Sequence, residues 1–309
     1  MTQNDDTPDA GRRAALECML WAGSGVLWTL VGGIPRSSVL AATPNKPGGS
    51  FSFAQISDSH LGFSAAPNTD VTATLQQALT QVKHQAAPAM MIHTGDVSHL
   101  SRPAQFDTAW QLIGATGIEA HYVPGEHDVL VDDGANFFER FTKGGPKGWY
   151  SFDQEGVHFI GLNNVQNLQA GGLGNLGAEQ LAWMAKDLNG RSASQPIVVF
   201  AHIPLWTISE EWSWGTADSE QALALLRRFG SVTVLNGHIH QVMQKVEGHV
   251  AFHTARSTAF PQPAPGTAPS PGPMKSVPSD KLRSMLGVRQ VSLVHGNADL
   301  AVVDSVLEG

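Results

Sequence analysis

Residues 51–60 of the chain read FSFAQISDSH, an apolar run of strand length that ends in Asp58 and His60. A short apolar run that is followed by polar residues is typical of a buried strand. In an extended segment, residues two positions apart lie on the same side, so Asp58 and His60 could reach one ion or two adjacent ions. This stretch predicts a strand that presents two metal-ligating side chains at its carboxyl end.

Four further motifs of this kind directly follow predicted strands. They are Gly95-Asp96, Gly125-Glu126-His127-Asp128, His202, and Gly237-His238-Ile239-His240. In open α/β sheets, ligands bind in the crevice beyond the carboxyl ends of the strands, so we expect all five motifs to converge there. Carboxylate oxygen with imidazole nitrogen suits manganese, iron or zinc better than a metal that prefers thiolates.

The rest of the chain alternates strand-length apolar runs with longer amphipathic segments, which predicts βαβ units and a largely parallel sheet. The expected strands are 51–57, 89–94, 119–123, 157–162, 197–201 and 232–236, and the expected helices are 69–87, 104–114, 136–142, 178–188 and 218–229. Segments 241–246 and 249–254 predict an antiparallel pair, and residues 288–304 predict a C-terminal β hairpin that turns at Gly296-Asn297. Residues 261–278 contain seven prolines and predict an extended loop.

The composition of the chain excludes several classes of partner and of binding site. The chain has 309 residues, of which 42% are hydrophobic, so it is long enough for a substantial core. Its formal net charge of -8 argues against a nucleic acid polymer or an anionic membrane as the main partner. A single cysteine, Cys18, excludes a disulfide framework and a cysteine-based zinc site.

The N-terminus resembles a twin-arginine export signal. Arg12 and Arg13 precede an apolar run over 18–33, and small residues follow as far as Ala42. The resemblance implies that residues 1–42 are removed and that a domain over 43–309 reaches the periplasm or the exterior, with no stable membrane span after processing. The alternative is an uncleaved N-terminal helix that anchors the chain, but the run is short for a span and contains glycines.

The order of the five motifs resembles that of the calcineurin-like metallophosphoesterases over residues 51–254. The resemblance implies an α/β fold, a four-layer αββα sandwich of two mixed β-sheets flanked by helices, with a dinuclear metal centre at the carboxyl ends of the strands. It implies Asp58, His60 and His240 as ligands of one ion, Asp96 as the bridge, and Glu126, His202 and His238 as ligands of the other ion.

The same resemblance implies hydrolysis of a small phosphate monoester or diester, with a metal-bridging hydroxide as the nucleophile. His127 matches the family histidine that protonates the leaving group. Asp128 is a candidate catalytic residue that orients a loop or a ring, and a plain turn residue is the alternative. The cofactors would be two metal ions, manganese or iron, with zinc as a further candidate. The oligomeric state stays open.

Two positions depart from the family pattern. Glu126 stands where the family has Asn, and His99 stands beside the ligands where many members have Asp. Two divalent ions, a hydroxide and two aspartates carry a net charge of about +1, which Glu126 lowers to about 0. We hypothesise that Glu126 compensates a trivalent ion, and that a protonated His99 pairs with Glu126; alternatively, His99 only caps the next segment. The competing function is a non-catalytic metal-binding envelope protein in which Glu126 damps hydrolysis.

Two other stretches invite functional interpretations. Residues 172–177 spell a glycine motif known from dinucleotide sites, but it begins about ten residues after the preceding strand, and no acidic residue ends the next strand. We therefore expect a loop there. Residues 205–215 hold Trp206, Trp212 and Trp214, which we expect to pack the loop down; stacking on a substrate is the alternative.

Overall fold

The computed structural model describes residues 26–31, 34–39, 51–84, 88–142, 145, 147–168, 172–293 and 300–307. The chain divides into two compact units, Met1–Lys46 and Pro47–Gly309. In the first unit, β1 (Val26–Val31) pairs with β2 (Ile34–Val39) as an antiparallel hairpin. The arginine pair and Ala42 of the predicted export signal lie outside the described residues. Within the described ranges, no helix has the length and hydropathy needed to cross a membrane.

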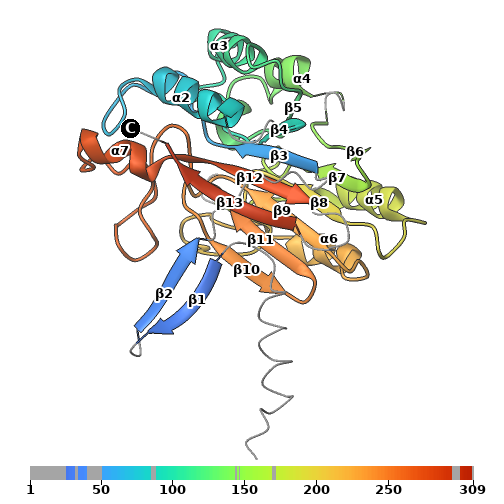
Figure 1. Cartoon of the computed structure of the whole chain (residues 1–309). Helices are drawn as coiled ribbons and strands as arrows, with labels where there is room; N and C mark the ends of the chain where they lie inside the picture. The colour runs from blue at the N-terminus through green and yellow to red at the C-terminus, as the bar shows by residue number, and fades with distance from the viewer. Residues whose placement is uncertain are drawn as a thin grey trace, which may run out of the picture. The chain divides into compact units, whose positions relative to one another are not determined.

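The second unit is built on two mixed sheets, which Figure 1 shows stacked between helices. The five-stranded sheet has the order β13 (Leu300–Val306), β12 (Gly287–Leu293), β3 (Phe51–Ile56), β4 (Met90–His93), β5 (Ala120–Tyr122). The six-stranded sheet has the order β10 (Gln244–Glu247), β11 (Val250–Thr254), β9 (Val232–Asn236), β8 (Ile197–Phe200), β7 (Val157–Gly161), β6 (Tyr150–Gln154). The strands that precede the motifs pair in parallel, and β12 and β6 add antiparallel partners.

Helices cover the outer faces of both sheets. Apolar side chains of α2 (Val71–His84), α3 (Pro103–Gly114), α4 (Ala135–Phe141) and α7 (Ser279–Met285) form one core with the five-stranded sheet. Those of α5 (Gly177–Leu188) and α6 (Ser219–Leu226) form a second core with the six-stranded sheet. The predicted four-layer αββα sandwich is therefore confirmed.

A third core lies between the two sheets and fixes how they face each other. Phe53 of β3 meets Phe159 of β7 edge to face, with ring centroids 5.4 Å apart, and Phe152 of β6 stacks on Phe159 at 4.9 Å. Burial of large aromatic side chains is the main stabilising term in such a core. Because both sheets are anchored here, the loops beyond their carboxyl ends share a common frame.

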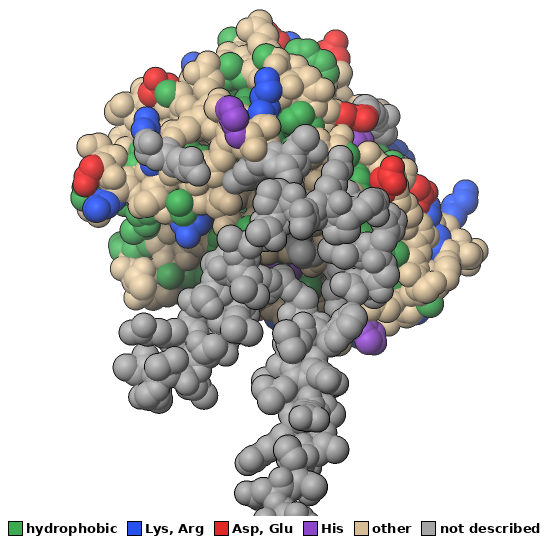
Figure 2. Space-filling model, viewed as in Figure 1, with side chains coloured by type: hydrophobic (Ala, Val, Ile, Leu, Met, Phe, Trp, Pro, Cys, Tyr) green, Lys and Arg blue, Asp and Glu red, His purple; other side chains and the backbone are tan. Residues whose placement is uncertain are grey.

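The expected strands and helices are present, with ends shifted by a few residues. The elements that were not predicted include β6, an edge strand without a buried alternating face, and α7, which at seven residues is too short to show a periodicity. Residues 261–278 contain no helix or strand. The expected turn at Gly296-Asn297 lies outside the described residues. On the face shown in Figure 2, Lys and Arg are interspersed with Asp and Glu.

Candidate metal centre

The five motifs lie just beyond the carboxyl ends of five strands, and the structure brings them together. β3, β4 and β5 of one sheet lead into the loops with Asp58, Asp96 and Glu126, while β8 and β9 of the other lead into those with His202 and His238. All seven predicted ligands fall in groups whose ligand atoms lie within 4.8 Å of one another: Asp58, His60, Asp96, Glu126, His202, His238 and His240. The candidate site therefore draws on both sheets.

Unusual backbone conformations turn these side chains inward. Five of the seven predicted ligands have positive φ angles, which are rare for residues other than glycine. The angles are 53° at Asp58, 41° at His60, 53° at Asp96, 70° at His238 and 55° at His240. Each such residue costs about 1–3 kcal/mol, so its retention at one site points to a functional constraint.

Three of the ligands form a buried group on one side of the site. The Nε2 atoms of His60 and His240 lie 3.2 Å apart, and Nε2 of His240 lies 3.3 Å from Oδ1 of Asp58. Each of these side chains is at most 3% exposed. Their ligand atoms are thus held close together with little access to bulk water.

A second group forms around Glu126, opposite the first. Its Oε2 lies 2.9 Å from Nε2 of His202, and its Oε1 lies 3.0 Å from Nδ1 of His238. Glu126 Oε2, His202 Nε2 and both ring nitrogens of His238 are nevertheless buried without a partner in hydrogen-bond geometry. Buried polar atoms are rarely left so. One ligand atom from each of Glu126, His202 and His238 lies within 4.8 Å of the others, so the residues present fit the implied ions.

Asp96 lies between the two groups. Its Oδ2 is 3.4 Å from Nε2 of His60 and 3.4 Å from Nε2 of His202. Its other oxygen, Oδ1, accepts a hydrogen bond from the backbone N–H of His127 at 2.9 Å. One carboxylate oxygen is therefore placed to contact ions on both sides, as a bridging ligand requires.

Backbone carbonyls orient two of the imidazole rings. His202 Nδ1 lies 2.7 Å from the carbonyl of Thr94, and His240 Nδ1 lies 2.5 Å from the carbonyl of Phe260. A carbonyl accepts only, so each Nδ1 carries a proton and each Nε2 is directed toward the site. This arrangement is common around metal-ligating histidines.

Burial and charge oppose each other at the carboxylates, and charge prevails. Burial raises the pKa of Asp58, but the neighbouring His240 and His202 lower the pKa to about 2. Burial also raises the pKa of Glu126, but the neighbouring His238 and His202 outweigh burial and hold the pKa well below its usual value. Burial lowers the pKa of His202, while Asp96 and Glu126 raise it well above the usual value. The carboxylates of Asp58 and Glu126 are therefore ionised at neutral pH.

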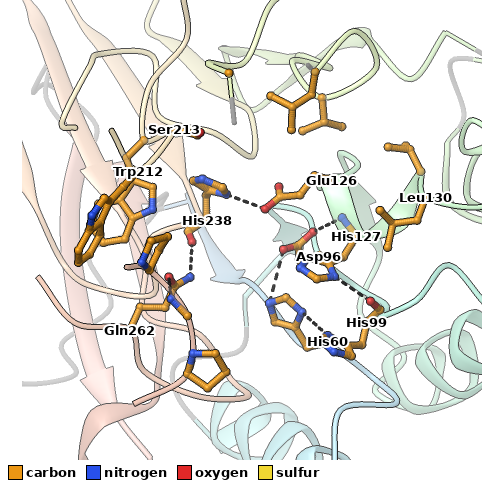
Figure 3. A pocket seen from close by; sticks show the side chains of 18 of the residues that line it. His60, Asp96, His99, Glu126, His127, Leu130, Trp212, Ser213, His238 and Gln262 are labelled. Atoms are coloured by element: carbon orange, nitrogen blue, oxygen red, sulfur yellow. Dashed lines mark hydrogen bonds and ion pairs between the residues drawn. The ribbon is translucent and has the colours of Figure 1, made fainter. Parts of the chain in front are cut away.

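His127 lies beside the two groups and lines the cavity above them (Figure 3). Its Nδ1 lies 2.7 Å from the carbonyl of His99, which fixes the proton on Nδ1. Burial lowers the pKa of His127, but the charges of Asp96 and Glu126 outweigh burial and raise it. The remaining nitrogen, Nε2, can therefore carry a second proton near neutral pH.

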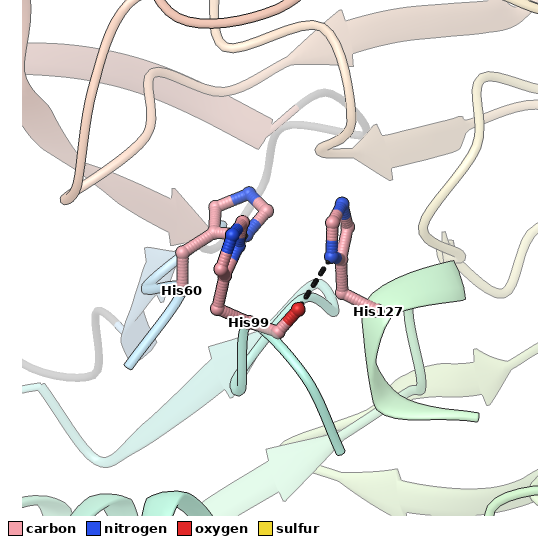
Figure 4. Close-up of side chains that lie close together, drawn as sticks. All are labelled: His60, His99 and His127. Atoms are coloured by element: carbon pink, nitrogen blue, oxygen red, sulfur yellow. Dashed lines mark hydrogen bonds between the residues drawn. The ribbon is translucent and has the colours of Figure 1, made fainter. Parts of the chain in front are cut away.

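His99 packs against neighbouring imidazoles. Its ring is nearly parallel to that of His127, with centroids 4.9 Å apart, and its Nδ1 lies 3.4 Å from Nδ1 of His60 (Figure 4). Burial and the proximity of His127 lower the pKa of His99. Glu126 pairs with His202 and His238 instead, so the structure does not bring His99 and Glu126 together as hypothesised. It does not make His99 a helix cap either, because α3 begins after Arg102.

Asp128 is fully buried behind the site and is not among the cavity residues. Its carboxylate accepts hydrogen bonds from the backbone N–H groups of Val97, Ser98 and Gly125 at 2.8 to 3.1 Å, and from the Ser98 hydroxyl at 2.9 Å. These bonds tie the loop of Asp96 to the loop of Glu126 and His127. The structure thus places Asp128 as a positioning residue, not as one that touches substrate.

A cavity of about 650 Å³ opens over the ligands. Part of its wall is the proline-rich loop, through Pro271, Gly272 and Pro273. Gln262 holds this loop: it accepts a hydrogen bond from the backbone N–H of Gly272 and donates one to the carbonyl of His238, each 2.9 Å long. Sequence reasoning missed Gln262, because a lone amide in a proline-rich stretch carries no signal.

Both other suggestive stretches have structural roles. Trp212 and Trp214 pack edge to face at 5.0 Å and cluster with Ile239, although both also line the cavity. In the glycine motif, a side chain at Gly174 would come within 2.9 Å of the carbonyl of Asn164, so close approach of the backbone explains this glycine.

The chain is similar to known phosphoesterases. The model of the calcineurin-like phosphoesterase family matches residues 51–242. A probable cyclic nucleotide phosphodiesterase of Psychrobacter arcticus is 24% identical over 236 residues, which make up 71% of this chain and 84% of that protein. The glycerophosphodiester phosphodiesterase GpdQ of Enterobacter lignolyticus is 25% identical over 267 residues, or 80% and 92%. The fold resembles a dimetal phosphatase from Danio rerio, with a TM-score of 0.58 and 14% identity, covering 84% of this chain and 99% of the other.

Replacing Asp128 by Asn should destabilise the fold by about 2 kcal/mol, because an amide cannot accept all four hydrogen bonds and leaves a buried donor unpaired. Equilibrium unfolding in denaturant measures the loss. Asp107→Asn is the matched control: that carboxylate is 55% exposed and pairs with Arg140 at the surface, so the loss should stay below about 1 kcal/mol. Equal losses in the two variants would contradict the positioning role.

Proposed function

Because the chain belongs to the calcineurin-like phosphoesterase family and so hydrolyses phosphoester bonds, we propose that its substrates are phosphodiesters. The observation that best supports a dinuclear site is the position of Asp96: one of its two carboxylate oxygens is equidistant from a histidine of each ligand group. The names of the two relatives, both phosphodiesterases, support a diester over a monoester.

We propose that one ion is held by Asp58, His60 and His240, the other by Glu126, His202 and His238, and that Asp96 bridges them. Two ions held there would polarise the phosphoryl oxygens and lower the pKa of water, as in other dinuclear hydrolases. The residues act by orientation: carbonyls fix His202 and His240, and Asp128 holds the loops of Asp96 and Glu126 in register.

His127 supplies the proton for the departing oxygen in this proposal. The carbonyl of His99 occupies its Nδ1–H, so only Nε2 can address a substrate in the cavity. Its raised pKa keeps Nε2 protonated near neutral pH, where a general acid is effective. The stacked ring of His99 keeps the His127 ring from turning away.

The direct test is hydrolysis by the purified chain after loading with manganese and iron. Bis(4-nitrophenyl) phosphate and 4-nitrophenyl phosphate serve as probes, with Asp96→Asn as the control because the amide loses the bridging charge. We expect hydrolysis of the diester by the wild type to exceed that by Asp96→Asn at least a hundredfold. Equal background in both proteins would instead favour a non-catalytic metal-binding protein of the envelope.

Replacing His127 by Ala should lower kcat by a factor of about 100 to 10,000 for a diester with an alkoxide leaving group, which needs a proton to depart. For a diester with a 4-nitrophenolate leaving group, the loss should be less than about tenfold, since that anion departs unaided. Wild type and variant are compared on both substrates. A loss that is the same for both leaving groups would show that His127 does not act as the acid.

Glu126 adds a negative charge where the family has a neutral amide, and we propose that this charge compensates a trivalent ion such as ferric iron. Metal analysis and electron paramagnetic resonance should find a ferric and a divalent ion in the wild type. Glu126→Asn, which removes the charge, should hold only divalent ions. Finding only divalent ions in the active wild type would refute the assignment.

A further inference from the structure

Beyond the ligand groups, the cavity has two apolar walls. Its apolar lining residues include Leu130, on the loop that follows His127, and Trp212, and they are completed by Val129, Val165, Leu168, Trp214, Pro271 and Pro273. In Figure 3, Leu130 and Trp212 lie on opposite sides of His238, Glu126 and Asp96. A substrate whose phosphoryl group meets the ligands would therefore place its organic groups against apolar side chains.

The exposure of Leu130 also indicates that the cavity binds an apolar group. Its side chain is 57% exposed although it lines the cavity, so it has apolar surface available for a ligand to cover. Ligand sites are mostly apolar with a few placed polar groups. Here the polar groups apart from the site residues are few, among them Gln166, Ser213 and Gln262.

The charged residues that line the cavity limit the negative charge that a bound substrate can carry. Among the described residues that line it there is no Lys or Arg, while Asp133 joins Asp96 and Glu126. A phosphate monoester carries nearly two negative charges at neutral pH, and a diester carries one. Because the described lining adds a carboxylate and no Lys or Arg around the ligand groups, it disfavours a second negative charge on the substrate.

We propose that the substrate is a monoanionic phosphodiester with at least one apolar or aromatic group, which packs between the Leu130 wall and the Trp212 wall. This proposal rests on the phosphodiesterase function above and adds the class of the organic group. It also disfavours nucleoside polyphosphates, because the described lining beyond the ligand groups includes Asp133 and no Lys or Arg to pair with additional phosphates.

Binding of inert diesters tests the proposal independently of turnover. With the manganese-loaded wild type, titration calorimetry should find dibenzyl phosphate bound at least about tenfold more tightly than dimethyl phosphate, since each buried ring removes a large apolar area from water. Equal affinities would overturn the proposal. If no ester is hydrolysed above the Asp96→Asn background, the proposed function fails, and the affinity ratio still decides the class of ligand.

Two matched variants locate the apolar group. Leu130→Gln should lower the affinity for dibenzyl phosphate about threefold or more and leave that for dimethyl phosphate unchanged, and Leu130→Met should restore it. Val131→Gln is the control, because Val131 is 69% exposed but is not among the cavity residues, and it should stay within twofold of wild type. Equal losses in Leu130→Gln and Val131→Gln would show that this wall does not contact the ligand.

Discussion

The contact on which the site depends is the approach of one Asp96 oxygen to His60 and to His202. Asp96 and His60 follow strands of the five-stranded sheet, whereas His202 follows a strand of the six-stranded sheet. The two distances can be equal only if the sheets face each other at a fixed separation. The aromatic core around Phe53 and Phe159 sets that separation, so packing deep between the sheets determines the geometry at their edge.

The candidate site also depends on interactions that stabilise its buried carboxylates. Buried carboxylates are costly unless opposite charges or hydrogen bonds offset the loss of water. Asp58 and Glu126 meet this condition with imidazoles. At Asp128, burial and the nearby Asp96 outweigh the hydrogen bonds from backbone N–H groups of two loops and raise its pKa to about 7. Asp96 serves two purposes, because its Oδ2 faces both ligand groups while its Oδ1 accepts a hydrogen bond from the backbone N–H of His127, which couples the order of this loop to the occupancy of the site.

Much of the fold and site followed from short-range pattern. The strand before each motif is a buried apolar run, and parallel strands place their carboxyl ends at one edge, so the grouping of Asp58, Asp96 and His238 could be predicted. The role of Asp128 could not, because two of its backbone partners, the N–H groups of Val97 and Ser98, lie 31 and 30 residues away along the chain. Nor could the surroundings of His99, whose contacts depend on rings brought in by other loops.

Five of the predicted ligands have a left-handed backbone conformation, which lowers the stability of the folded protein. Each strained residue costs about 1–3 kcal/mol, which is large beside the net 5–15 kcal/mol by which a typical domain is stable. Glycine would relieve the strain at any of them, but would remove the side chain that binds. Selection for a more robust fold and selection for a working site therefore pull in opposite directions at Asp58, His60, Asp96, His238 and His240.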